Sequence, residues 1–252
     1  MADRLVQYSV DRGIARIALD SPRNRNALSA TLVEQLTHAL TEAGTDDTVR
    51  AVELTHTGSV FCAGADLTET RQAAMRAGAT RVLTLLRDIV ALPKPVVGSI
   101  DGHVRAGGLG LVGACDIVLA GPASTFAFSE VRLGLAPAMI SLTTLPRMGP
   151  RAASRYYLTG ETFDATTAGR IGLITEAVHD IDEGTLAVLD ALRACSPQGL
   201  RETKLLLTAG ILEAFETRAE ALAEQSVRLF ETDEAAEGMS AFLAKRPPSW
   251  AG

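Results

Sequence analysis

Three segments of the chain combine residue types that suit ligand binding by the backbone or proton transfer. The first is HTGSVFCAGADLTE, residues 56–69, in which Cys62 to Asp66 carry almost no side-chain bulk. A backbone this bare lets a ligand approach main-chain N–H groups closely. A helix beginning just after it would add free N–H groups and the positive end of its dipole. The same composition is also typical of a tight turn between a strand and a helix.

The second segment is DGHVRAGGLGLVGACDIVLA, residues 101–120, with Gly107 and Gly108 at the expected start of a short helix. The backbone is again exposed at a helix N-terminus. Gly108, Gly110 and Gly113 also match G-x-G-x-x-G, a pattern of dinucleotide-binding proteins. That pattern requires the glycines to follow a strand directly and to open a full crossover helix. Here six residues follow the preceding strand, and the next strand begins too soon, so we discount a dinucleotide site.

The third segment is FAFSEVRLGLAP, residues 126–137, which places Glu130 among apolar residues. A carboxylate in such surroundings is expected to have a raised pKa, which suits proton transfer near neutral pH. The purely structural alternative is an ion pair with a nearby arginine such as Arg132. Each segment alone is ambiguous, and only the three together indicate a catalytic site.

Alternating strands and helices would position these segments. Asp11-Arg12-Gly13 predicts a hairpin turn between two strands. Ser29 is a candidate helix N-cap, followed by leucines at helical spacing. The further elements expected here are strands at 51–55, 95–101 and 115–120 and a helix from about Leu67 to Pro93.

The pattern becomes almost entirely helical from about Asp182, with amphipathic helices expected at 200–230 and 233–245. Alternating strands and helices predict the α/β class. We therefore expect a core over residues 1–190 and a C-terminal helical region over residues 191–252. The second part is interpreted as an appendage and not as an independent domain.

Composition excludes several other classes of protein. The 252 residues are 47% apolar and 21% charged, which suits a folded chain with a sizeable core. A net charge of −6 argues against nucleic acid as a partner. Three scattered cysteines argue against a disulfide framework and against a metal site. Neither a signal peptide nor a membrane-spanning stretch is expected, so we predict a cytoplasmic protein.

Together the three segments resemble the signatures of the crotonase (enoyl-CoA hydratase/isomerase) family. FCAGADL resembles the first signature, and DGHVRAGGLGL followed by CDIVLA resembles the second, usually N-G-x-A-x-G-G-G before a C-D strand. FSEVRLGLAP resembles the third, and PRNRNALS resembles an early loop that binds coenzyme A. The similarity continues through YYLTGETFDATTAGRIGLITEAV, so it covers most of the chain in the expected order.

The resemblance implies a fold, an assembly and a set of roles. The fold is a crotonase-like spiral of β-β-α turns with a C-terminal helical trimerisation region, and the assembly is a homotrimer or homohexamer. No separate cofactor is implied, because coenzyme A is part of the acyl-CoA substrate. The implied catalytic groups are the N–H groups of Ala65 and Gly107, as an oxyanion hole, and Glu130. The implied binding residues for the CoA ester are Arg25, Ala27, Ala63, Ala65, Asp66, Leu67, Gly107 and Lys245, the last a residue that a neighbouring subunit could supply.

The sequence departs from the family's hydratases at one position. These hydratases carry a second glutamate two residues after the last glycine of the second signature, and that position is Gly110 here. Two carboxylates can hold and activate one water molecule. Three interpretations stay open. The first is a hydratase that uses Glu130, and some hydratases of branched or carboxylated enoyl-CoA also have glycine at the position of Gly110. The second is a Δ3,Δ2-enoyl-CoA isomerase, and the third is a CoA-ester-binding protein with little catalysis.

Overall fold

The computed structural model describes residues 3–66 and 72–251, and it begins with the predicted hairpin. Strands β1 (Val6–Asp11) and β2 (Ile14–Leu19) pair antiparallel and are joined by two residues. Arg12 has φ 44° and Gly13 has φ 79°. A two-residue hairpin turn of this kind needs positive φ at both positions, which glycine adopts without strain. The hairpin expected from the sequence is therefore confirmed.

The strands form two sheets. The larger has six strands in the order β1-β2-β3-β5-β7-β10, and from β2 onward all neighbours are parallel. The smaller has four strands in the order β4-β6-β8-β9, of which β4, β6 and β8 are parallel. The bounds are β3 (Ala51–His56), β5 (Val96–Ile100), β7 (Ile117–Ala120) and β10 (Glu176–Ala177) in the large sheet, and β4 (Val60–Cys62), β6 (His103–Arg105), β8 (Thr125–Ala127) and β9 (Phe163–Asp164) in the small one.

Successive turns of the chain contribute one strand to each sheet. Strands β3 and β4 precede α2 (Gln72–Ala91), β5 and β6 precede α3 (Gly107–Ala114), and β7 and β8 precede the 3-10 helix η2 (Ser129–Leu133). This repetition is the spiral of β-β-α turns that we predicted. Strand β6 is not among the strands expected from the sequence, where residues 101–106 belong to an irregular glycine-rich segment. A strand of three residues is too short to show a period.

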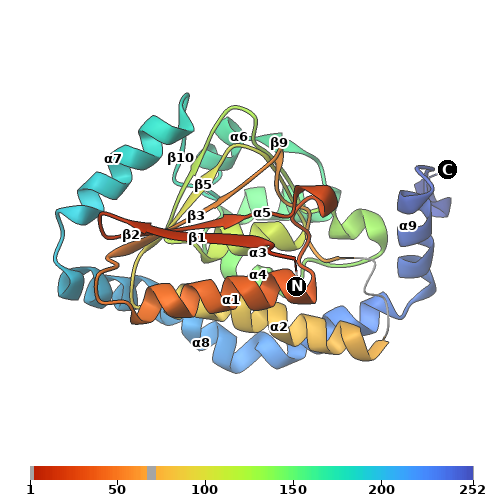
Figure 1. The fold of residues 1–252 in the computed structure, drawn as a ribbon. Coiled ribbons are helices and arrows are strands. Elements are labelled where there is room, and N and C mark those ends of the chain that lie inside the picture. Colours follow the sequence, from red (N-terminus) through yellow and green to blue (C-terminus); the bar gives the residue numbers. More distant parts are fainter. Residues whose placement is uncertain (1–2, 67–71, 252) are drawn as a thin grey trace.

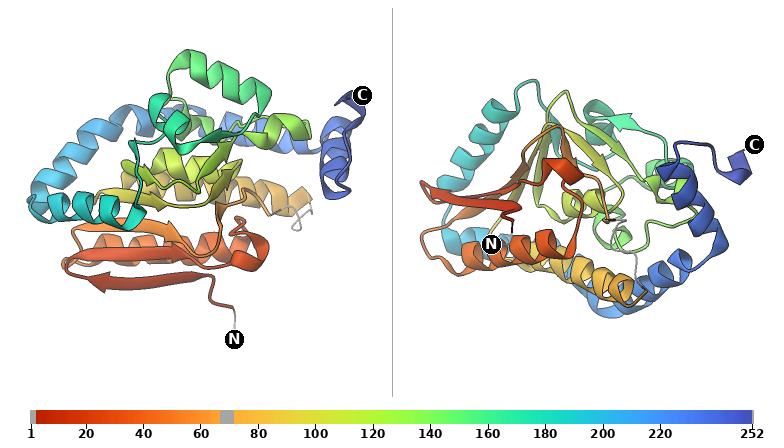
Figure 2. Two further views of the ribbon diagram at one scale, coloured as in Figure 1. Left: turned by 90° about the horizontal axis from the view of Figure 1, so that it is seen from above. Right: turned by 45° about the vertical axis from the view of Figure 1, so that its right-hand side comes forward.

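Long helices cover the sheets (Figure 1). Helices α1 (Ala30–Thr45), α2 and α8 (Pro197–Phe230) run side by side below the strands in this view. Helix α7 (Ile181–Arg193) lies at the upper left and contacts β3, β5 and β7 of the large sheet. Helix α9 (Asp233–Leu243) stands apart from them, against η2 (Figure 2). The shorter elements are η1 (Pro22–Asn24), α4 (Ser141–Thr144), α5 (Pro150–Thr159), α6 (Ala165–Arg170) and η3 (Ser249–Ala251).

Local sequence explains where α1 begins and which face it buries. The Ser29 hydroxyl accepts a hydrogen bond from the N–H of Leu32 at 3.3 Å, so the predicted N-cap is confirmed. Leu32, Leu36 and Leu40 are all at most 1% exposed. Their spacing places them on one face of the helix, packed on the sheets.

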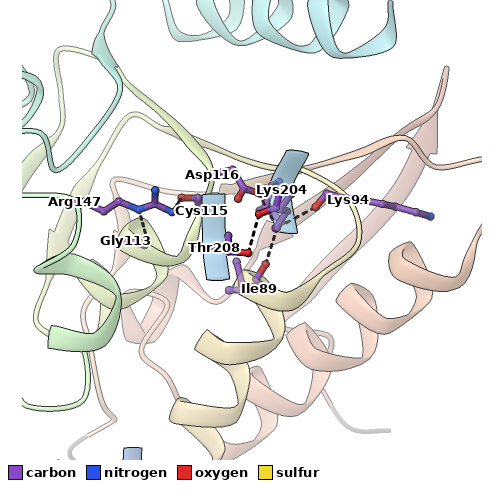
Figure 3. A network of polar contacts seen from close by, with 9 residues as sticks. Ile89, Lys94, Gly113, Cys115, Asp116, Arg147, Lys204 and Thr208 are labelled. Atoms are coloured by element: carbon purple, nitrogen blue, oxygen red, sulfur yellow. Dashed lines mark hydrogen bonds and ion pairs between the residues drawn. The ribbon is translucent and has the colours of Figure 1, made fainter. Parts of the chain in front are cut away.

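A buried ion pair anchors α8 to the core (Figure 3). The ammonium of Lys204 lies 2.7 Å from the carboxylate of Asp116, and both side chains are nearly inaccessible to solvent. Lys204 also donates to the carbonyls of Ile89 at 2.9 Å and Lys94 at 3.1 Å. The Asp116 carboxylate accepts the N–H of Val96 at 2.8 Å. One side chain of α8 therefore joins the end of α2 to the parallel strands.

The expected division near residue 190 stays a prediction, because α7 runs through that point and packs on β3, β5 and β7. None of the helices in the described ranges is both long and apolar enough to cross a membrane. Over the same ranges, no group of three His, Cys, Asp or Glu side chains is arranged to hold a metal ion.

Candidate active site

The three candidate segments follow three neighbouring parallel strands of the small sheet. Strand β4 leads into Ala63 to Asp66, β6 leads into α3, and β8 leads into η2 with Glu130. Carboxyl ends of adjacent parallel strands meet at one edge of a sheet, and ligands bind at such edges in open α/β sheets. The topology therefore brings together segments that are up to about 65 residues apart along the chain.

The first segment is held open by backbone hydrogen bonds to the early loop. The N–H of Leu28 donates to the carbonyl of Gly64 at 2.8 Å, and the N–H of Ala63 donates to that of Arg25 at 3.1 Å. Gly64 has φ 89°, a conformation that glycine adopts without strain. Ala65 forms a parallel bridge with Leu28, and its N–H has no hydrogen-bond acceptor among the residues that the structure describes.

A second free N–H group lies beside the first. Gly107 is the first residue of α3, so its N–H has no acceptor within the helix. A Cβ atom placed on Gly107 would lie 3.6 Å from the nitrogen of Ala65 and 3.4 Å from the Cα of Gly64. Both amides are thus at the same point of the sheet edge. Two neighbouring, unused donors suit an oxygen that gains negative charge.

The residue before Gly107 is conformationally unusual. Ala106 has φ 46° and ψ −122°, a region that residues other than glycine rarely adopt. Its Cβ would lie 2.8 Å from a Cβ placed on Gly64, so the first segment needs glycine there. The backbone strain sits immediately next to one of the two donors.

The early loop is fixed by the buried side-chain amide of Asn26, which is not among the candidate site residues expected from the sequence. Asn26 is 0% exposed, and its Oδ1 accepts the N–H of Ser21 at 2.7 Å. Its Nδ2 donates to the carbonyls of Val60 at 2.8 Å and Thr57 at 3.2 Å. This side chain ties the loop to the start of β4 and so places Arg25 and Ala27 at the edge of the site.

Glu130 occupies a setting in which its carboxylate is poorly solvated. Its Oε2 atom is buried and has no hydrogen-bond partner among the described residues. Burial raises the pKa of Glu130 from its ordinary value to about 7. Among the described residues Arg132 does not pair with it: the buried Oε2 of Glu130 has no partner, and the Arg132 guanidinium donates to the carbonyl of Thr159 at 3.2 Å. The raised pKa expected from the sequence is confirmed, and the ion-pair alternative is wrong.

The Tyr157 phenol interacts electrostatically with Glu130, and its own proton already takes part in a hydrogen bond. The ring of Tyr157 packs on Phe128 with centroids 4.3 Å apart, and its hydroxyl is hydrogen-bonded to Thr144. The Thr144 hydroxyl donates its single hydrogen to the carbonyl of Ile140 at 2.7 Å. Tyr157 must therefore donate to Thr144, and this leaves its proton unavailable to the carboxylate.

Ala65, Gly107 and Glu130 line one cavity of about 610 Å³. Of the residues that the resemblance implied, the cavity brings together Arg25, Ala27, Ala63, Ala65, Asp66, Gly107 and Glu130. Leu67 lies outside the described residues. Lys245 follows the end of α9 with φ 52° and is exposed, and it is not among the residues lining this cavity.

Much of the cavity wall comes from residues outside the three candidate segments. Leu28 precedes α1, Val82 belongs to α2, and Ile140 immediately precedes α4. The C-terminal part of the same chain also reaches the cavity, through Ser226 and Phe230 and through two residues at the end of α9, Phe242 and Leu243. A signal for this wall was the apolar run from Leu135 to Ile140, which begins five residues after Glu130.

Gly108, Gly110 and Gly113, which match the dinucleotide pattern, serve helix packing here. A Cβ on Gly108 would lie 2.7 Å from the carbonyl oxygen of Cys62 at the end of β4. A Cβ on Gly113 would lie 2.7 Å from the carbonyl carbon of Thr143 in α4. Both distances are below van der Waals contact, so α3 needs these glycines to approach its neighbours.

Known proteins share the sequence and the fold over nearly the whole chain. A crystal structure of an enoyl-CoA hydratase from Mycobacterium avium is 53% identical, with a TM-score of 0.94, and the match covers 98% of this chain and 99% of that one. A carnitinyl-CoA hydratase from the same organism is 28% identical, with a TM-score of 0.86 and 99% coverage of both chains. The mitochondrial methylglutaconyl-CoA hydratase of Mus musculus is 30% identical over 96% of this chain and 81% of its own length. The family model for enoyl-CoA hydratase/isomerase matches residues 9–252, and the chain belongs to this family of enzymes acting on CoA esters.

Proposed function

We propose that the protein is a hydratase that adds water to the double bond of a 2-enoyl-CoA thioester. The two free N–H groups of Ala65 and Gly107 bind the thioester oxygen, on which negative charge develops as the enolate forms. Removing one such donor typically costs about 3 kcal/mol of transition-state stabilisation. The observation that supports this role is the proximity of the two amides at one cavity edge.

Glu130 performs the proton transfers in this proposal. Its carboxylate takes a proton from the attacking water, whose oxygen bonds to C3, and the same proton is then delivered to C2. A base with a pKa near the working pH is well matched to both halves of this task. Burial raises the pKa of Glu130 to about 7, which is the feature of the side chain that supports this assignment.

The proposed acyl group is branched or carboxylated. This is supported by the mouse relative, which is a methylglutaconyl-CoA hydratase, and by guanidinium groups among the cavity-lining residues. Arg105 is half-buried there, and its guanidinium donates hydrogen bonds to the carbonyls of Val104 at 2.8 Å and Thr125 at 2.7 Å. Arg25 is exposed at the same cavity and suits the phosphates of coenzyme A.

A Δ3,Δ2-enoyl-CoA isomerase is the second candidate, and one observation favours it. Glu130 and Asp66 are the two carboxylates among the lining residues, and the position of the second hydratase glutamate is occupied by Gly110. A single glutamate can move a proton between C2 and C4 without any water.

The proposed assembly is a homotrimer or homohexamer, for which Leu206 and Leu207 of α8, 81% and 67% exposed, offer apolar surface.

Incubation with a 2-enoyl-CoA and with a 3-enoyl-CoA tests these proposals. A product heavier by one water identifies a hydratase, and a shifted double bond at unchanged mass identifies an isomerase. Glu130→Gln should lower turnover by at least ~100-fold while CoA-ester binding is retained. Glu213→Gln, which removes an exposed carboxylate on α8, is the matched control. Unchanged turnover in Glu130→Gln would remove this residue from the mechanism.

A further inference from the structure

The cavity wall beside α3 is formed by a side chain from elsewhere in the chain. Gly110 is buried and is not among the lining residues, whereas Ile140 is. A Cβ placed on Gly110 would lie 2.7 Å from Cγ2 of Ile140 and 3.1 Å from Cδ1 of Leu86. The first distance is far below van der Waals contact. Ile140 therefore stands between residue 110 and the cavity.

Ile140 is held in this place by a dense set of hydrogen bonds. Its carbonyl accepts the N–H groups of Thr143 at 3.2 Å and Thr144 at 3.0 Å, together with the Thr144 hydroxyl. The hydroxyl of Thr143 lies 3.0 Å from the carbonyl of Gly110, and so links the two segments directly. Ile140 is only 3% exposed. A residue so constrained cannot move aside cheaply for a side chain on α3.

We propose that Ile140 is a specificity-determining residue of this site. Its side chain takes the place that a residue-110 side chain would need to reach the cavity, and it makes that part of the wall apolar. A carboxylate on residue 110 can reach this wall only if Ile140 changes as well. The inference rests on the proposed function, because it assigns to this pair of residues the choice between adding water and moving a double bond.

A stability cycle tests the placement of Ile140 without any assay of activity. Gly110→Ala should lower Tm by about 2–10 °C, because the new methyl overlaps Cγ2 of Ile140. Gly210→Ala in α8 is the matched control, since a Cβ there meets nothing within 4 Å, and it should raise Tm or leave it unchanged. Ile140→Leu removes the Cγ2 branch and should reduce the loss caused by Gly110→Ala. Ile140→Val keeps that branch and should not.

The functional part is tested by product ratios. Gly110→Glu combined with Ile140→Ala should raise hydration relative to isomerisation by about tenfold or more over Gly110→Gln combined with Ile140→Ala. Gly110→Glu alone should not give this gain. If either double variant fails to fold, Ile140→Glu against Ile140→Gln places the carboxylate on the lining residue itself, and the same rise is expected.

Three outcomes would overturn the inference. Gly110→Ala could be as stable as the wild type, Gly110→Glu alone could give the full gain, or the product ratio could be equal in the Glu and Gln variants that retain CoA-ester binding. Failure of the proposed function gives a different result. In that case the wild-type protein neither adds water nor shifts the double bond, while the stability cycle still decides where Ile140 lies.

Discussion

A Cβ atom added to Gly64 would lie 3.0 Å from the amide nitrogen of Gly107, so the first loop and the start of α3 touch backbone to backbone. No side chain separates the two free N–H groups of the candidate oxyanion hole. Their relative position is therefore set by the packing of two backbones on adjacent parallel strands. Donors fixed in this way require little reorganisation when charge develops on a bound oxygen.

Ala65→Pro should abolish one of these donors selectively. Proline lacks the N–H group, and the N–H of Ala65 has no acceptor among the described residues, so little stability depends on it. We expect kcat to fall by about 10²–10³-fold, the usual loss for one oxyanion-hole donor, with little change in Tm. Ala65→Gly keeps the N–H and is the control that should stay active. A folded Ala65→Pro protein with wild-type turnover would exclude this amide from catalysis.

Ala106→Gly should stabilise the protein. Ala106 is held at φ 46° and ψ −122°, and such backbone strain costs about 1–3 kcal/mol in a residue other than glycine. Glycine removes the strain but adds about 0.4–1 kcal/mol of unfolded-state entropy. We expect a net gain of about 1 kcal/mol in the free energy of unfolding, measured by urea titration. Ala236→Gly, at an exposed position inside α9, should instead lose about 1 kcal/mol.

The sequence predicted those parts of the site that depend on local chemistry. Arg12-Gly13 predicted a hairpin turn, the bare backbone around Ala65 and Gly107 predicted accessible amides, and the apolar neighbours of Glu130 predicted its raised pKa. Each of these signals lies within a few residues of the feature it predicts. The resemblance to a family then supplied the architecture, which strand and helix patterns alone would not have reached.

Features made by distant residues could not be predicted in this way. Strand β6 has three residues and is defined by its pairing with β4 and β8, not by its own composition. The occupant of the space beside Gly110 comes from Ile140, thirty positions later in the chain. The residues next to Gly110 and Ile140 in the sequence do not predict this contact. The pairing of Lys204 with Asp116 likewise joins helix to strand across the fold.

Lys204→Met should destabilise the fold strongly. It leaves the buried Asp116 carboxylate without its cation and frees the carbonyls of Ile89 and Lys94. Breaking a buried pair from one side costs about 3–5 kcal/mol. Adding Asp116→Asn should recover part of this loss, because no unpaired charge then remains. Arg201→Met, an exposed cation on the same helix, should change stability by less than about 0.5 kcal/mol.

The raised pKa of Glu130 should make this residue a cost to stability at neutral and alkaline pH. The folded protein holds the proton with a pKa of about 7, above the ordinary value of 4.5 that the unfolded chain approaches. Because the folded state binds the proton more tightly, folding is most favoured below pH 4.5, and this contribution is lost as pH rises through about 7. Glu130→Gln stays neutral and avoids the loss.

We therefore expect Glu130→Gln to have a higher Tm than the wild-type protein at pH 8 and nearly the same Tm at pH 4, where both side chains are uncharged. Glu213→Gln on the exposed face of α8 should show no such divergence between the two pH values. A Tm difference for Glu130→Gln that does not change with pH would mean that this carboxylate titrates normally.

The same carboxylate must be ionised to take a proton from water, so kcat/KM of the wild-type enzyme should fall as pH drops below about 7. If burial of Glu130 serves catalysis, the wild-type protein should lose stability and gain kcat/KM over the same pH range as the pH rises.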